Sequence, residues 1–443
     1  MSTLSVMIVT VFVIGYMCIA LESLTKINKA AIALLMCVLC WTLLMMGPGA
    51  YYPTVEPNGL LHHISEVIEH HLGDAAGTLF FLMGAMTIVE IVDSNGGFNF
   101  VRDTMKTRSK RKLLWRVAFM TFFLSAILDN LTTSIVMIMV LRKLVQQREE
   151  RLIYASLIIV SANSGGAFSP IGDVTTIMLW IKGVITTQGV ISELLLPSLV
   201  SMIVPAFILQ YSLKGKFDAA QNLQVAEVSQ FTKAQRTAIF WLGVGGLVFV
   251  PIFKTITHLP PFMGILLVLG VLWTVTEIFH YNTSEDDTMA KRVSDLLSRI
   301  DMSTIMFFLG ILMAVAVLQE IGVLTALGEG LNEAFSGNYY LIDGIIGVLS
   351  SIVDNVPLVA GCMGMYPVAA EGAMAVDGIF WQLLAYCAGV GGSMLIIGSA
   401  AGVVVMGLEK ITFGWYLKRI TWIAFVGYLA GILCYWAERM LLF

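Results

Sequence analysis

The stretch SAILDNLTTSIVMIMVL, residues 125–141, places Asp129 and Asn130 in the middle of otherwise apolar sequence. The pair returns in SSIVDNVPLVAG, residues 350–361, as Asp354 and Asn355. An ionised aspartate at the centre of a membrane helix costs about 2.5–3.5 kcal/mol. Such residues are also good helix N-caps. A cap accounts for one polar residue at each site but not for two adjacent ones at both sites, so we favour a functional interpretation.

The surrounding chain has the composition of a membrane protein. Of its 443 residues, 58% are hydrophobic and 13% are charged. Because a membrane helix needs roughly 20 apolar residues, the hydropathy predicts an all-α integral membrane protein whose partner is the lipid bilayer, not nucleic acid. The first run lacks a basic n-region, so we expect a retained helix rather than a signal peptide. The predicted full spans are 4–21, 29–47, 76–93, 152–183, 192–212, 237–252, 262–280, 303–321, 380–406 and 420–437.

The basic residues give an orientation. All 26 lysines and arginines except Lys182, Lys254 and Arg439 fall on one face of this layout. The positive-inside rule makes that face cytoplasmic and puts both termini outside. The segment HHISEVIEHH, residues 62–71, then lies outside. It is either a metal or pH-sensing cluster or, as we favour, a short amphipathic interfacial helix; its histidines are His62, His63, His70 and His71.

Four sequence similarities recur in the same order in the two halves of the chain. CWTLL (40–44) resembles LWTVT (272–276), FFLMGAM (80–86) resembles FFLGILM (307–313), the DN pairs match, and ANSGGAFSPIGD (162–173) aligns with AGVGGSMLIIGS (388–399). Each half holds five full spans, an odd number, so the two halves must have opposite orientations. This predicts an inverted-topology repeat of residues 1–227 and 228–443, as in many secondary transporters.

Each half also contains a pair of short apolar arms. Residues 344–353 form about 15 Å of helix, too little to cross a bilayer. We therefore predict two re-entrant hairpins, 113–147 entering from the cytoplasm and 344–370 entering from outside. Their tips, Asp129–Asn130 and Asp354–Asn355, are expected to meet near the membrane midplane.

Spans 152–183 and 380–406 are predicted to be broken helices, because glycine and proline interrupt them. The interrupting residues are Gly165, Gly166, Pro170 and Gly172 in the first and Gly391, Gly392 and Gly398 in the second. Broken backbone at membrane depth exposes carbonyls that bind cations. The candidate ligands are Asp129, Asn130, Thr132, Thr133, Asn163, Ser164, Ser169, Asp173, Thr175, Thr176, Asp354, Asn355, Ser393 and Ser399, with a Na⁺ site expected near Asp129, Asn130, Ser164 and Asp173.

Two further expectations concern charge. The first half has Asp129 and Asp173 in its polar layer, whereas the second has Asp354 alone. Glu90, Asp93 and Glu320 lie toward span ends, where we expect interfacial solvation. No buried lysine or arginine is expected near either tip, which argues that a cation, not an anion, is the substrate.

The phrases DNLTT (129–133), ANSGGAFSPIGDVTT (162–176) and DNVPL (354–358) resemble the NhaD-type sodium/proton antiporters of the ion transporter superfamily. That superfamily includes sodium–dicarboxylate symporters, whose tips carry Ser-Asn-Thr, and arsenite permeases. The resemblance covers nearly the whole chain. It implies a homodimer with elevator-type alternating access in a bacterial cytoplasmic membrane.

The aspartates replace the symporter serines, which favours exchange of Na⁺, or Li⁺, for H⁺ without a cofactor. Asp129, Asp173 and Asp354 would bind cation or proton in competition. The alternatives are a sodium-coupled dicarboxylate symporter, an arsenite permease, and an intramembrane enzyme. No His-Glu-x-x-His helix or Gly-x-Ser-x-Gly elbow supports the enzyme.

Overall fold

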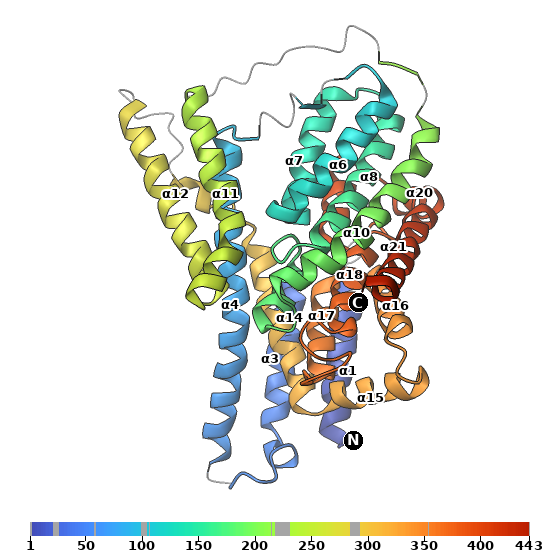
Figure 1. Ribbon diagram of the computed structural model, residues 1–443. Coiled ribbons are helices and arrows are strands. Elements are labelled where there is room, and N and C mark those ends of the chain that lie inside the picture. The colour runs from blue at the N-terminus through green and yellow to red at the C-terminus, as the bar shows by residue number, and fades with distance from the viewer. Residues whose placement is uncertain are drawn as a thin grey trace.

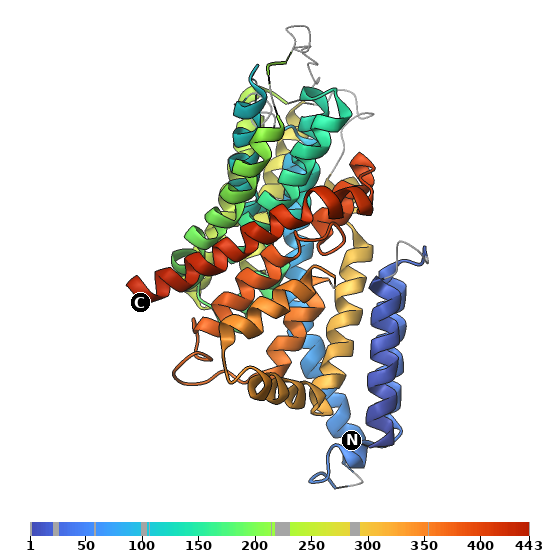
Figure 2. The ribbon, with the colours of Figure 1, turned by 90° about the vertical axis from the view of Figure 1, so that its right-hand side faces the viewer.

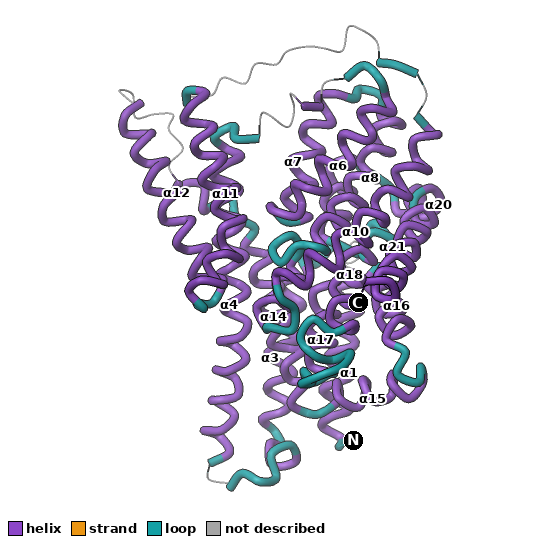
Figure 3. The backbone as a smooth tube through the Cα atoms, in the orientation of Figure 1, coloured by secondary structure: helices purple, strands orange, loops and turns teal. Residues whose placement is uncertain are grey.

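A computed structural model describes residues 2–20, 26–56, 59–98, 104–105, 107–213, 215–217, 231–283, 293–352 and 354–442. These residues form helices joined by loops, and no strand occurs among them beyond one isolated bridge between Ser109 and Lys216 (Figure 3). The all-α prediction is therefore confirmed. The expected boundary between the two halves, at 227 and 228, falls outside the described residues.

The first part of the chain contains eight α-helices within the described ranges. They are α1 (Thr3–Ala20), α3 (Lys29–Met45), α4 (Leu60–Ser94), α6 (Lys110–Leu128), α7 (Asn130–Leu144), α8 (Arg148–Ala167), α9 (Val174–Lys182) and α10 (Thr187–Leu209).

The second part of the described chain follows a similar order with three additional short helices. Its members are α11 (Lys233–Thr257), α12 (Pro261–Thr283), α13 (Val293–Leu297), α14 (Met302–Glu320), α15 (Val323–Ala334), α16 (Tyr339–Ser350), α17 (Asn355–Met365), α18 (Ile379–Gly391), α19 (Ala400–Glu409), α20 (Phe413–Arg419) and α21 (Thr421–Leu442).

Six of the described helices, α4, α10, α11, α12, α14 and α21, are long and apolar enough to cross a membrane. Helices α1 and α3 are slightly shorter, and the two broken spans are each divided into two helices. A multi-pass membrane protein is confirmed, and the count of ten full spans stays a prediction.

Two helical hairpins enter the molecule from opposite ends (Figure 1). Helices α6 and α7 lie at the upper end and α16 and α17 at the lower end, with their tips directed toward the middle. The first tip is Asp129, between α6 and α7, and the second lies between Ser350 and Asn355. The lower hairpin starts at Tyr339, five residues before the predicted start, so its first arm also contains Asp343.

The two broken helices pass close to the hairpins because glycines allow their backbones to approach. Gly165 of α8 lies against the Phe122 carbonyl of α6, and Gly391 of α18 lies against the Gly347 carbonyl of α16. A Cβ at either glycine would overlap these carbonyls. The two contacts occupy matching places in the two parts of the chain.

The remaining helices pack on either side of this centre. Helix α10 runs along α21, which crosses the molecule obliquely in Figure 2. Helices α4, α11 and α12 pack together at the left of Figure 1, and α3 packs against α14 and α1. The histidine-rich segment 62–71 is the first part of the continuous 35-residue helix α4, so the separate short interfacial helix is wrong.

Candidate functional site

The tips of both hairpins meet at the carboxylate of Asp173. Asn130 Nδ2, at the start of α7, donates to Asp173 Oδ2 over 2.7 Å. Asn355 Nδ2, at the start of α17, donates to Asp173 Oδ1 over 3.4 Å. Asp173 is 1% exposed, so these donors lie in a closed interior. One carboxylate thus accepts a hydrogen bond from each hairpin tip.

Asp173 is also the N-cap of α9, the second half of the first broken helix. Its Oδ1 receives the Thr175 backbone N–H over 3.0 Å and the Thr175 hydroxyl over 2.9 Å. The positive end of the α9 dipole stabilises a negative charge at this place. Asp173 is therefore a fully buried carboxyl with hydrogen-bond donors on both of its oxygens.

Asn163 connects this carboxylate layer to the second broken helix. Its Oδ1 accepts from Asn130 Nδ2 over 3.0 Å. Its Nδ2 donates to Ser393 Oγ over 3.0 Å and to Ser399 Oγ over 2.9 Å. Ser399 in turn caps α19 through the Gly402 N–H. The predicted oxygen ligands of both broken helices are thus joined in one network.

Two buried hydroxyls near this network have no hydrogen-bond partner among the described residues. They belong to Thr133, one turn after Asn130 on α7, and to Thr176, on the first turn of α9. Hydroxyl, amide and carboxylate oxygens suit hard cations. No group of three or more His, Cys, Asp or Glu side chains gathers within the described parts of the chain. One carboxylate among neutral oxygens fits a monovalent cation better than a divalent one.

Asp129 stands at the first hairpin tip in an uncommon backbone conformation, with φ +80° and ψ 160°. Its carboxylate receives the Thr132 N–H over 2.8 Å and the Thr132 hydroxyl over 2.9 Å. A non-glycine residue in this region costs on the order of 1–3 kcal/mol, and such strain gathers at functional sites. Asp129 therefore caps α7 and holds a strained tip beside the Asp173 cluster.

Two other predicted ligands, Ser164 and Ser169, form hydrogen bonds with neighbouring helices. The Ser164 hydroxyl receives a hydrogen bond from Ser201 of α10 over 2.8 Å. Ser169 Oγ donates to the Ala126 carbonyl of α6 over 2.5 Å. The sequence contained no signal for Ser201, which lies on a different span.

Asp354, at the second tip, forms an ion pair that the sequence analysis did not anticipate. Lys29 Nζ lies 2.8 Å from Asp354 Oδ2, and the same ammonium lies 4.2 Å from the centre of the Phe307 ring. The Lys29 side chain is 24% exposed and that of Asp354 15%. The sequence analysis expected no buried lysine or arginine near either tip. Lys29 is only partly buried, but it reaches the second tip because the fold places it there, although it is distant in sequence.

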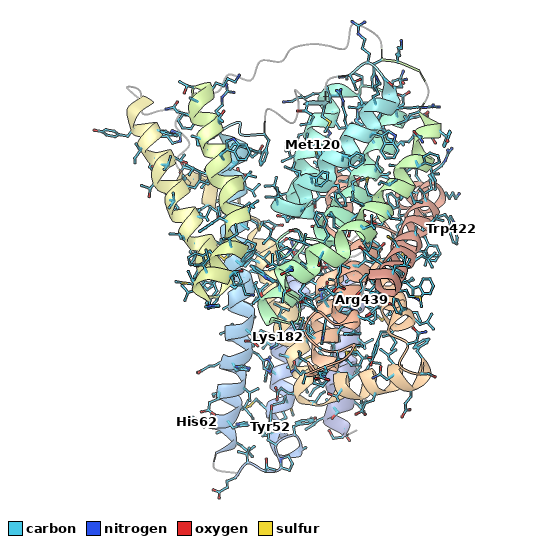
Figure 4. The ribbon with its side chains drawn as sticks, in the orientation of Figure 1. Tyr52, His62, Met120, Lys182, Trp422 and Arg439 are labelled. Carbon is cyan, nitrogen blue, oxygen red and sulfur yellow. The ribbon has the colours of Figure 1, made fainter. Side chains whose placement is uncertain are left out.

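A cavity of about 850 Å³ is lined by residues of α4, α9, α14 and α17 and by the start of α12. Lys182 of α9 and Asp74 of α4 form an ion pair of 3.1 Å at its wall. Figure 4 shows Lys182 beside α4, with Tyr52 and His62 farther down at the end of the molecule.

Glu320 at the edge of the same cavity is held by two side chains. His71 Nε2 lies 2.8 Å from Glu320 Oε1, and the Tyr52 hydroxyl donates to Oε2 over 2.7 Å. Burial, and then the hydrogen bond to Glu320, raises the pKa of Tyr52 above its usual range. Glu320 is partly exposed, as expected for a residue near a span end, and it also links α14 to α4 through these two side chains.

Comparisons with known proteins show which family and which relatives the chain resembles. The CitMHS family model, described as a citrate transporter, matches residues 16–385. Sodium/proton antiporter 1 of Arabidopsis thaliana is 46% identical over 98% of this chain and 72% of its own. The Na(+)/H(+) antiporter NhaD of Alkalimonas amylolytica is 30% identical over 96% of this chain and 88% of its own.

A similar fold occurs in a solved structure. The Alcanivorax borkumensis YdaH transporter superposes with a TM-score of 0.60, covering 87% of this chain and 90% of that one. Only 11% of the aligned residues are identical, so this likeness concerns the fold alone.

Proposed function

Because the chain belongs to the CitMHS family of membrane transporters, and matches sodium/proton antiporters over nearly its whole length, we propose that the Asp173 cluster is its ion site. The protein is a secondary transporter that exchanges Na⁺ for H⁺. The main observation behind this assignment is that Asn130 and Asn355, one from each hairpin tip, both donate a hydrogen bond to the Asp173 carboxylate.

Exchange follows from competition at one carboxyl group. Ionised Asp173 binds Na⁺ together with neutral oxygens. The unpartnered hydroxyls of Thr133 and Thr176 and the amide oxygen of Asn163 are the candidates that support this proposal. Protonated Asp173 has no net charge and releases the cation. If the site must bind either Na⁺ or H⁺ whenever it changes sides, it carries Na⁺ across the membrane in one direction and H⁺ in the other. Li⁺, the other small alkali cation, suits the same oxygens.

The tips at Asp129 and Asp354 contribute charge beside this carboxyl, and their hairpins give access to it from opposite sides. The matching contacts of Gly165 with Phe122 and of Gly391 with Gly347 support an inverted repeat of two halves. In such a repeat, one arrangement of the halves opens the site to one side and its counterpart opens it to the other. We assign alternating access of the elevator type on this basis.

A dicarboxylate symporter or an arsenite permease is not favoured. An organic dianion would meet the carboxylates of Asp129 and Asp173. Lys29 offers no compensating positive charge, because Asp354 already neutralises it.

The lipid bilayer surrounds the protein, and apolar side chains exposed on α12 and α21 are suited to contact it. Among them are Leu266, Leu267, Val271, Trp422, Val426 and Leu433. We further propose a homodimer in a bacterial cytoplasmic membrane with both termini outside, in keeping with the asymmetry of basic residues in the sequence.

The test is a pH-gradient dequenching assay on everted vesicles, with Na⁺, Li⁺ and K⁺ added in turn. Asp173→Asn should abolish Na⁺-induced dequenching while leaving expression and monodispersity unchanged. The control is Asp301→Asn, because Asp301 caps α14 through Thr304 in the same manner but is exposed. Wild-type Na⁺ affinity and pH profile in Asp173→Asn would show that Asp173 is only a cap.

A further inference from the structure

Asp343 is a buried carboxyl that lies outside the Asp173 cluster. It belongs to α16, the first arm of the lower hairpin, and is 0% exposed. Neither of its carboxylate oxygens receives a hydrogen bond from any described residue. The hydroxyls of Thr121 and Thr133 in the first hairpin also lack a partner among the described residues, but a carboxyl without a partner is far more costly to bury than a hydroxyl, so Asp343 requires an explanation.

The surroundings of Asp343 do not support a negative charge. The ionisable side chains that interact with it electrostatically are Cys362 of α17, Tyr366 after α17, Cys387 of α18 and Tyr428 of α21. None of them is cationic. The Tyr428 hydroxyl donates to the Gly344 carbonyl over 2.9 Å, and that of Tyr366 to the Gly328 carbonyl over 3.2 Å.

An ionised carboxylate buried without donors or a counter-charge is very costly, and in practice such a group is neutralised instead. Asp343 must therefore hold a proton in this conformation. The charged form becomes accessible only when the contacts of α16 with α17, α18 and α21 change or when water reaches them.

The fold does not need a carboxyl at this place. With the offset of 225 residues that relates the two DN pairs, Asp343 corresponds to Ala118 of α6, which is equally buried. At the corresponding position of the first hairpin, the buried side chain is thus only a methyl group. A carboxyl retained at a membrane-buried position with no structural partner is by default a functional group.

Asp343 also lies on the arm of the hairpin that leads to the tip. It precedes Ser350 by seven residues, which is about 10 Å along the α16 axis, and the tip follows. By the sequence-based topology, this arm runs from the outer face toward the tip. Asp343 is therefore an intermediate position between the outer face and Asp354.

We propose that Asp343 is a second proton-binding site of the transporter, which takes up one H⁺ on one side of the membrane and releases it on the other in each cycle. The proposal rests on the Na⁺/H⁺ exchange given above. Asp173 exchanges one H⁺ for one Na⁺, and Asp343 carries a further H⁺ without a cation. Two H⁺ then move against one Na⁺, and each cycle moves one net positive charge.

The test is the reversal potential of reconstituted proteoliposomes, in which the membrane potential that stops net flux is measured at fixed Na⁺ and H⁺ gradients. Asp343→Asn imitates the protonated carboxyl in shape and charge. It should lower the H⁺/Na⁺ ratio from two to one and remove the dependence of Na⁺ flux on membrane potential. An unchanged ratio and an unchanged voltage dependence would overturn the proposal.

The control for packing is Ser350→Ala, which removes a hydrogen bond of 2.7 Å to the Ala388 carbonyl in the same arm and should leave the ratio unchanged. If Asp343→Asn does not fold, labelling of the wild-type protein with dicyclohexylcarbodiimide, an apolar reagent for protonated carboxyls, replaces it. A mass increase at Asp343 that declines as the pH rises supports proton binding, and the lack of one contradicts it.

These outcomes are separable from failure of the proposed function. Loss of Na⁺ exchange in Asp173→Asn, with a wild-type ratio in Asp343→Asn, would leave the antiporter standing and remove only the second proton site. Retained exchange in Asp173→Asn would reject the main ion site, while carbodiimide labelling would still decide whether Asp343 binds a proton.

Discussion

The ammonium of Lys29 lies 2.8 Å from Asp354, so the first residue of α3 is joined to the tip of a hairpin 325 positions later in the chain. Helix α3 packs with α1 and α14, and the hairpin packs with α18 through α16 and with α14 through α17. The ion pair therefore adds a direct link between the start of α3 and the hairpin tip, at a place that would have to move during alternating access.

A double-mutant cycle tests whether this pair is energetically coupled. Lys29→Gln and Asp354→Asn should each lower the thermal unfolding midpoint in detergent, because each leaves a partly buried charge without its partner. The double variant should recover most of the loss, with a coupling energy of about 0.5–3 kcal/mol. Lys26→Gln, at an exposed lysine, is the control. Additive single effects would mean that the pair contributes nothing.

The two hairpin asparagines should differ in their effect on Na⁺ binding. Asn130 donates to Asp173 over 2.7 Å and Asn355 over 3.4 Å. A hydrogen bond to a charged group contributes about 1.5–3 kcal/mol, so Asn130→Ala should raise the apparent Km for Na⁺ roughly tenfold to a hundredfold. Asn355→Ala should raise it less. Asn338→Ala, at the exposed cap of α16, serves as the control in the same flux assay. Equal effects of the two hairpin variants would contradict the geometry.

The close backbone contacts of the broken helices predict an intolerance to alanine. Gly165→Ala and Gly391→Ala would each place a methyl group against a backbone carbonyl and destabilise the protein by about 1–3 kcal/mol. Gly245→Ala in α11 has no atom within 4 Å of the added Cβ. It should be neutral or stabilising by up to about 1 kcal/mol. Thermal unfolding of the three variants checks this. A Gly165→Ala protein as stable as the wild type would contradict the close backbone contact between α8 and α6.

Glu409 should be a stability residue that transport does not use directly. Its side chain is 1% exposed, and its two oxygens each lie 2.7 Å from an arginine, Arg142 of α7 and Arg151 of α8. Removing one partner from a buried ion pair costs about 3–5 kcal/mol, so Glu409→Ala should unfold at a clearly lower temperature. Glu329→Ala, at an exposed position of α15, should not. If Glu409→Ala unfolds like the wild type, α19 is not anchored to the first hairpin through this residue.

The sequence by itself determined the class of the protein and the regions where the two hairpins turn and the two broken spans are interrupted. Long apolar runs require a membrane, and α6 ends just before Asp129 as the polar pair indicates. Pro170 and Gly172 likewise lie in the interruption between α8 and α9. Gly165 and Gly166, predicted to interrupt the helix, are still part of α8, and Gly165 serves its close contact with α6. These are local properties, since a chain segment carries its own hydropathy, its own caps and its own helix-breaking residues.

Only the tertiary structure decided which polar groups meet. Lys29 reaches Asp354, Asn355 reaches Asp173, and Asp343 turns into the protein with no partner among the described residues. The sequence could not reveal these relations because lipid is as apolar as a protein interior. Hydropathy therefore does not distinguish a helix face that contacts lipid from one that contacts another helix, and the pairing of faces depends on packing along the whole chain.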